Sequence, residues 1–242
     1  PKTPKPRIYD FSLPFKMRSV FRETFTSLPS GVNWYPGHMR KTIRNLGDEL
    51  KKVNLFVEVR DSRIPLTSHN PALIEQLPPQ MKKIVVYNKL DLANSRKSLD
   101  LIKRLKLDSQ TVDSFAMSTK DNVNIAKLLK SLATNAPTEF RTVGSWVMIG
   151  GMPNLGKSTI INALRTRDPE IKSAGKKRHK GGARVGPKPC LTKSMSGFRV
   201  VTDPAMYLVD TPGIIVPKLT DESEEALKLA ACHAIRDGII DD

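Results

Sequence analysis

A glycine-rich stretch that ends in lysine and serine has the residue types and spacing that bind phosphate. It reads Gly151-Met-Pro-Asn-Leu-Gly-Lys-Ser158 and matches G-x-x-x-x-G-K-[ST]. Its glycines let backbone N–H groups converge on phosphate oxygens, and the helix expected next adds the positive end of its dipole. We expect Lys157 to bridge the β- and γ-phosphates and Ser158 to bind Mg²⁺. The other expected nucleotide contacts in this loop are Asn154, Leu155, Gly156 and Thr159.

A second motif, Asn88-Lys89-Leu90-Asp91, has the residues that distinguish guanine from adenine. The Asp91 carboxylate can accept hydrogen bonds from the ring N–H and the exocyclic amine of guanine, whereas adenine offers the opposite pattern. Alone the motif is weak evidence, but beside a phosphate loop it predicts GTP and GDP as ligands. A turn similar to the S-A-K sequence that supports the base follows at Ser118, Thr119 and Lys120, with Thr119 in place of the usual alanine.

Asp210-Thr-Pro-Gly213 supplies the residue types that sense the terminal phosphate. We expect Asp210 to hold Mg²⁺ through water and the Gly213 N–H to contact the γ-phosphate. Thr192 is the best candidate for a switch residue that reaches both Mg²⁺ and the γ-phosphate.

Strands that alternate with helices must position these motifs. Hydrophobic patterns predict strands at 53–59, 83–87, 114–118, 146–150, 197–201 and 206–209, and helices at 71–77, 99–107, 124–134, 157–165 and 222–236. This order predicts an α/β fold of three layers around a mostly parallel six-stranded sheet, with ligands at the carboxyl ends of the strands.

The base-reading motif precedes the phosphate loop, which reverses the usual order of P-loop GTPases. We therefore predict a circularly permuted GTPase domain over residues 33–220, preceded by a basic extension at 1–32 and followed by the start of a helical segment at 221–242. Joining the usual termini costs little because they lie close together at the surface of such a domain.

The composition points to a polyanionic partner. Forty Lys and Arg against 24 Asp and Glu give a formal net charge of +16, which favours nucleic acid or an anionic membrane surface. The two cysteines lack metal-ligand spacing, so neither a disulfide framework nor a zinc site is expected. No apolar run approaches the roughly 20 residues of a transmembrane helix. We expect a monomer without a transmembrane segment, for which peripheral membrane contact stays open.

The motif order, with Asn33-Trp-Tyr-Pro-Gly-His-Met39 ahead and Asp61-Ser-Arg-Ile-Pro65 after the first strand, resembles the circularly permuted ribosome-assembly GTPases of the ribosome biogenesis GTPase A type. The resemblance runs from about residue 33 to 236 and is greatest for the mitochondrial ribosome-associated GTPase 1 branch. It implies a GTPase that acts in assembly of the large ribosomal subunit, with ribosomal RNA as partner. Members of this family also carry a C-terminal helical RNA-binding domain.

The residue after Asp210-Thr-Pro-Gly213 is Ile214, whose apolar side chain cannot orient water as the glutamine of many GTPases does. The resemblance implies that His38 has the catalytic role, and a near-neutral imidazole suits it. The alternative is that the motif around His38 forms a packing corner of the fold, with His38 as a helix-capping or surface residue. Asn154 matches the position at which potassium-dependent GTPases ligate K⁺, with backbone capping as its alternative.

A basic segment lies between the phosphate loop and Asp210. Residues 172–193 contain eight Lys and Arg and no acid, interleaved with glycines, which is typical of attraction to phosphodiester backbones. A solvated loop is the alternative. The expected RNA contacts are Lys176, Lys177, Arg178, Lys180 and Arg184.

Two further alternatives stay open. The chain could be a nucleotide-gated RNA-binding scaffold with negligible turnover, for which Ile214 would be the signature. Its basic leader suits the remainder of an organelle transit peptide, and equally a sequence that simply begins there. The expected location is the mitochondrion, in the matrix or against the inner membrane, and the bacterial cytoplasm or a nucleolus is the alternative.

Overall fold

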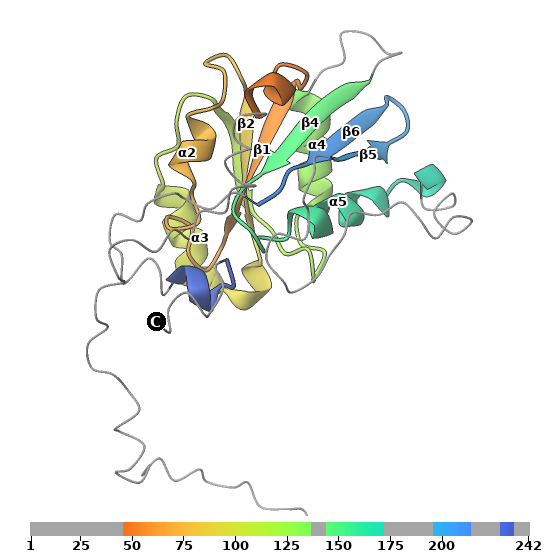
Figure 1. The fold of residues 1–242 in the computed structure, drawn as a ribbon. Coiled ribbons are helices and arrows are strands. Elements are labelled where there is room, and N and C mark those ends of the chain that lie inside the picture. The colour runs from red at the N-terminus through yellow and green to blue at the C-terminus, as the bar shows by residue number, and fades with distance from the viewer. Residues whose placement is uncertain (1–45, 137–143, 172–195, 214–227, 235–242) are drawn as a thin grey trace, which may run out of the picture.

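Parallel strands with one antiparallel edge form the sheet of this protein. The computed structural model describes residues 46–136, 144–171, 196–213 and 228–234. Within them the strand order is β3-β2-β1-β4-β6-β5 (Figure 1). The strands are β1 (Leu55–Asp61), β2 (Lys83–Asn88), β3 (Thr111–Ala116), β4 (Ser145–Gly150), β5 (Ser196–Val201) and β6 (Met206–Asp210). Their neighbours pair in parallel except for β5, which runs antiparallel to β6.

Helices cover both faces of this sheet (Figure 1). They are α2 (Pro71–Ile74), α3 (Ser95–Arg104), α4 (Ile125–Asn135) and α5 (Lys157–Arg165), with a 3-10 turn at Leu90–Leu92. The largest core cluster joins α4 and α5 to alternate residues of the strands, such as Val57 and Ile149. On the other face, helical residues 46–50 and α2 pack on Phe56 and Met148, and α3 packs on Tyr87. The three predicted layers are therefore confirmed.

The register of the parallel strands brings the motifs to one edge. Asp61 is paired with Asn88, and Ile149 at the end of β4 is paired with Asp210 at the end of β6. Because carboxyl ends of parallel strands meet at one edge of a sheet, the base-reading turn, the phosphate loop and the Asp210 motif all begin there. The base-reading strand precedes the phosphate-loop strand in the chain, so the predicted circular permutation is confirmed.

The predicted elements differ from the observed ones mainly at their ends. Helix α3 begins at Ser95, four residues before the predicted start, because the Asn94 side chain caps it by accepting from the Lys97 N–H at 3.3 Å. It ends before Leu105, whose backbone is extended, although its side chain still packs in the core. Of the predicted helix at 222–236, residues 228–231 are helical and the remainder lies mostly outside the described residues. No helix in the described part of the chain is long and apolar enough to cross a membrane.

Candidate nucleotide-binding site

The phosphate loop turns from β4 into α5 with two glycines in the left-handed half of backbone space. Gly151 has φ +144° and Gly156 has φ +89°. A side chain at Gly151 would collide with the carbonyl oxygen of Val59. Both positions therefore need glycine for conformation and for space. The loop continues into α5 at Lys157, so the helix N-terminus faces the same opening as the loop amides.

Lys157 folds back over its own loop. Its side chain is buried, and Nζ donates to the carbonyl oxygens of Gly151 at 3.1 Å and Met152 at 2.7 Å. A buried ammonium needs such partners to offset its loss of hydration. Its contact with phosphate oxygens, which carry full charge and form stronger hydrogen bonds than carbonyl oxygens, stays a prediction.

Asn88 joins the phosphate loop to the base-reading loops. Its Nδ2 donates to the Leu155 carbonyl at 2.9 Å, and its Oδ1 accepts from Thr119 Oγ1 at 2.7 Å and from Thr119 N at 3.3 Å. A Cβ on Gly156 would lie 2.5 Å from Asn88 Nδ2, so the glycine permits this approach. The Thr119 hydroxyl, at the position where such turns usually have alanine, thus adds a hydrogen bond that alanine could not make.

The carboxylate that we expect to read guanine is held by the neighbouring loop. Ser118 Oγ donates to Asp91 Oδ1 at 2.8 Å and accepts from the Asp121 N–H at 3.0 Å. Lys120 is exposed, whereas the Lys89 side chain is 20% exposed and reaches back toward the sheet. The structure therefore brings together Asn88, Lys89, Asp91 and the 118–120 turn, although their contacts with GTP stay a prediction.

Two of the residues expected around Mg²⁺, Ser158 and Asp210, also lie together. Ser158 Oγ donates to Asp210 Oδ2 at 2.7 Å, and Thr211 Oγ1 donates to the Ile149 carbonyl at 2.8 Å. A Cβ on Gly213 would lie 2.6 Å from the Pro153 Cα, so the end of the Asp210 motif rests directly on the phosphate loop. A hydroxyl and a carboxylate side by side are hard oxygen donors, and they fit Mg²⁺ bound with phosphate oxygens and water.

Asn154 has a partner that sequence reasoning missed. It lies in the left-handed region with φ +56°, and its Nδ2 donates to the His233 carbonyl at 2.7 Å. His233 belongs to the short C-terminal segment at 228–234, whose Leu229 and Cys232 are buried. Burial raises the pKa of the Cys232 thiol, and the negative charge of Asp61 raises it further. This segment therefore lies against the edge of the sheet that carries the site (Figure 1).

Several predicted functional residues lie outside the described residues. These are His38, Thr192, Ile214 and the five basic residues Lys176, Lys177, Arg178, Lys180 and Arg184. In the sequence, Asp61-Ser-Arg63 has no role beyond carrying the family resemblance, whereas in the structure the Asp61 carboxylate is buried at the base-reading turn, with Oδ2 3.2 Å from Lys89 Nζ. A signal was available, because an acid directly after a buried strand is expected at the ligand-binding edge.

The strand order and the convergence of the three motifs define a circularly permuted P-loop GTPase domain. Residues 146–240 match the family described as 50S ribosome-binding GTPase. The chain is 32% identical to mitochondrial ribosome-associated GTPase 1 of Mus musculus, over 93% of this chain and 68% of that protein. It is 34% identical to mitochondrial GTPase 1 of Schizosaccharomyces pombe, over 93% of this chain and 71% of that protein. The chain belongs to this mitochondrial GTPase 1 family.

Other similar proteins extend the comparison. Short integuments 2, mitochondrial, of Arabidopsis thaliana is 34% identical over 86% of this chain and 53% of that protein. This chain thus spans only part of the length of these relatives, from 53% to 71%. The crystal structure of YjeQ from Thermotoga maritima superposes with a TM-score of 0.43 and 18% identity, over 73% of this chain and 55% of that one.

Proposed function

We propose that this chain is the GTP-hydrolysing part of a mitochondrial assembly factor for the large ribosomal subunit. The observation that carries the proposal is the Asn88 amide, which ties the phosphate loop at Leu155 to the base-reading turn at Thr119. Such a link suits a ligand that has phosphates at one end and a base at the other. The names of the relatives, mitochondrial and ribosome-associated, support the location and the partner.

The described residues divide the work of nucleotide binding. Asp91 reads the guanine edge, Lys157 binds the β- and γ-phosphates, and the Gly213 N–H contacts the γ-phosphate. Ser158, and through water Asp210, would hold Mg²⁺, which would neutralise charge on the phosphate oxygens. Since Gly213 rests on Pro153, loss of the γ-phosphate changes contacts at the start of the segment that leads toward the C-terminus.

Because the apolar side chain of Ile214 cannot orient water, water activation falls to another residue, His38. Thr192 completes the Mg²⁺ site in the GTP state, and ordering of the basic segment at 172–193 by ribosomal RNA would bring it there. Asn154 is the proposed K⁺ ligand. Its amide nitrogen faces the His233 carbonyl at 2.7 Å, which is compatible with Oδ1 facing a cation. The proposed location is the mitochondrial matrix, with the inner membrane as a peripheral site and a monomer as the active form.

The decisive experiment measures GTP hydrolysis with and without purified large mitochondrial ribosomal subunits, in K⁺ and in Na⁺. We expect the subunit to stimulate hydrolysis, K⁺ to support it better than Na⁺, and His38→Ala to lose the stimulation while GDP affinity is kept. Trp34→Phe, which changes the same motif without touching the imidazole, is the matched control and should retain stimulation.

Each outcome has a distinct meaning. Tight GTP binding without hydrolysis under any condition would contradict the enzyme and favour the nucleotide-gated scaffold. Hydrolysis that is equal in K⁺ and Na⁺ would remove K⁺ and the cation role of Asn154 from the proposal. Normal stimulation of His38→Ala would assign water activation to another group.

A further inference from the structure

Asp61 is a completely buried carboxylate beside the base-reading turn. It ends β1, and the strand register places it level with Asn88 at the end of β2. Its Oδ2 lies 3.2 Å from Lys89 Nζ. Arg63 donates to both carboxylate oxygens, from Nε to Oδ1 at 2.9 Å and from one terminal nitrogen to Oδ2 at 2.7 Å. Burying a charge is costly unless it is paired, so these two cations stabilise the carboxylate at this place.

The backbone around Asp61 is tied to the same turn. The Ser62 N–H donates to the Asn88 carbonyl at 2.8 Å, and Ser62 Oγ donates to the Tyr87 carbonyl at 2.8 Å. The Asp61 N–H donates to Ser68 Oγ at 2.9 Å. The carboxylate is therefore fixed relative to the base-reading turn, unlike a surface ion pair whose two long side chains lose entropy when they meet.

Lys89 occupies an unusual position in that turn. Its φ of +62° is left-handed, which costs a residue with a Cβ of the order of 1 kcal/mol. It stands between Asn88, which links the loops, and Asp91, which is expected to read the base. The apolar stem of a lysine can cover a flat ring while its ammonium stays paired. With Nζ bound to Asp61, the Lys89 stem must run from the turn back to the sheet.

Electrostatics connects the same cluster to Asp91. Burial raises the pKa of Asp61, but the hydrogen bonds from Arg63 and the charge of Lys89 outweigh it and lower that pKa below its usual value. The hydrogen bond to Asp61 raises the pKa of Arg63, and the charge of Asp91 acts in the same direction. Arg63 is thus within electrostatic reach of the base-reading carboxylate. Without Asp61, Arg63 would be drawn toward Asp91, in competition with guanine.

We propose that Asp61 is a positioning residue for guanine recognition that acts through Lys89. It holds the ammonium so that the lysine stem lies along the base site, and it keeps Arg63 from occupying Asp91. The inference rests on the proposed GTP-binding function and adds to it a residue outside the phosphate loop and the two base-reading motifs.

The test is a double-mutant cycle on nucleotide affinity. Binding of GDP and of inosine diphosphate (IDP) is measured by calorimetric titration for the wild-type chain, Asp61→Asn, Lys89→Met and the double variant. Lys89→Met keeps an apolar stem but removes the ammonium that Asp61 holds. We expect each single variant to bind GDP at least about tenfold more weakly, because each breaks a charge-assisted contact. The double variant should bind GDP no more weakly than the single variant with the lower GDP affinity.

The preference for GDP over IDP separates positioning from general stability. IDP lacks the exocyclic amine that Asp91 would bind, so Asp61→Asn should reduce this preference as Arg63 moves toward Asp91. Glu58→Gln is the matched control, because Glu58 is equally buried on β1 but binds Arg60 and His69. It should lower stability and leave the GDP to IDP ratio unchanged.

The outcomes are distinguishable. Wild-type GDP affinity in Lys89→Met, or losses in the two single variants that multiply in the double variant, would overturn the inference while the proposed function stands. Equal losses in Asp61→Asn and Glu58→Gln would do the same, since they would indicate a general structural effect. If Asp61→Asn does not fold, Lys89→Met decides, because that side chain is 20% exposed. A wild-type chain that does not bind GDP refutes the proposed function and this inference with it.

Discussion

Replacing Asn88 with alanine should separate the phosphate loop from the base-reading loops. The Asn88 side chain is buried and takes part in three hydrogen bonds, with Leu155 O at 2.9 Å, Thr119 Oγ1 at 2.7 Å and Thr119 N at 3.3 Å. A hydrogen bond contributes about 1 kcal/mol net, and the third bond is long, so the expected loss of stability is about 2–3 kcal/mol.

Nucleotide binding should weaken in the same variant. In the wild-type chain the Asn88 side chain links the two loops by hydrogen bonds within the protein, whereas in Asn88→Ala the nucleotide itself must order them. This ordering costs at most the free energy of the lost link, so GDP affinity should fall by up to about 30- to 150-fold.

The assay combines urea unfolding with calorimetric titration of GDP. Leu132→Ala is the matched control, because Leu132 is fully buried on α4 and its truncation should cost a similar 2–5 kcal/mol or so. It should leave GDP affinity unchanged, since α4 contributes no residue to the site. The reasoning would be refuted by an Asn88→Ala variant that is destabilised as expected yet binds GDP like Leu132→Ala.

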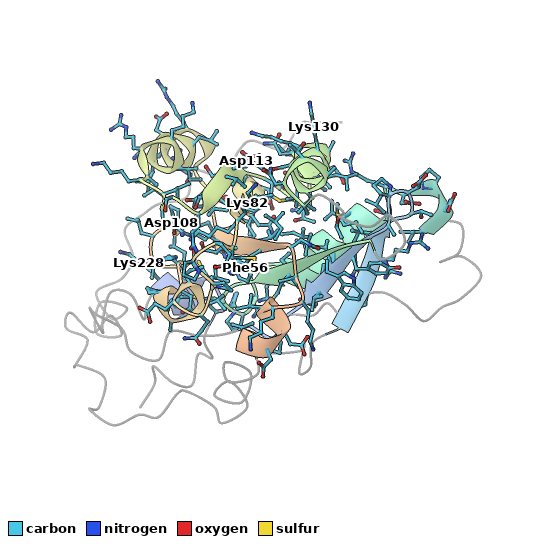
Figure 2. The ribbon with its side chains drawn as sticks, turned by 90° about the horizontal axis from the view of Figure 1, so that it is seen from above. Phe56, Lys82, Asp108, Asp113, Lys130 and Lys228 are labelled. Atoms are coloured by element: carbon cyan, nitrogen blue, oxygen red, sulfur yellow. The ribbon has the colours of Figure 1, made fainter. Side chains whose placement is uncertain are left out.

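Two further predictions concern charge. Burial raises the pKa of Glu58, but hydrogen bonds from His69 and Arg60 outweigh it and lower the pKa from 4.5 to about 2. The ionised Glu58 carboxylate therefore contributes about 3 kcal/mol to the free energy of unfolding above pH 4.5, and this contribution is lost as the pH falls toward 2. In urea unfolding, the stability difference between wild type and Glu58→Gln should shrink between pH 4.5 and pH 2. A difference that stays constant over this range would contradict the lowered pKa. Replacing four lysines of the 172–193 segment with glutamate should abolish subunit-stimulated hydrolysis and spare GDP binding. The same replacement at four exposed lysines on or beside α3 and α4 should retain stimulation. If the segment variant loses both stimulation and GDP binding, the RNA role of the segment is contradicted. The control positions are Lys97, Lys103, Lys106 and Lys130, of which Lys130 projects outward from α4 (Figure 2).

Local patterns predicted the elements that carry their own signals. Helix α5 begins and ends where predicted, at Lys157 and Arg165, because the phosphate loop determines its start and its apolar residues recur with helical spacing. The predicted start of α3 was wrong by four residues. The charged residues after Asn94 show no apolar periodicity, so only the capping hydrogen bond reveals where the helix begins. The chain order of Asn88, Lys157 and Asp210 was sufficient to predict the permuted fold, because strands at one edge can be reconnected without changing their spatial order.

The sequence by itself determined the class of ligand, the parallel sheet and the permutation. The ligand class follows from residue types at fixed local spacing, the sheet from the alternation of strands and helices, and the permutation from the order of the motifs along the chain. The tertiary structure decided which distant residues meet, such as Asn88 with Leu155 across 67 positions and Asn154 with His233 across 79. It also decided that Asp61 faces Lys89 rather than solvent. The contacts of Asp61 and Asn88 depend on strand register, because a shift of one residue would send these two strand side chains to the opposite face of the sheet. The contact of Asn154 with His233 depends instead on the path of the loops.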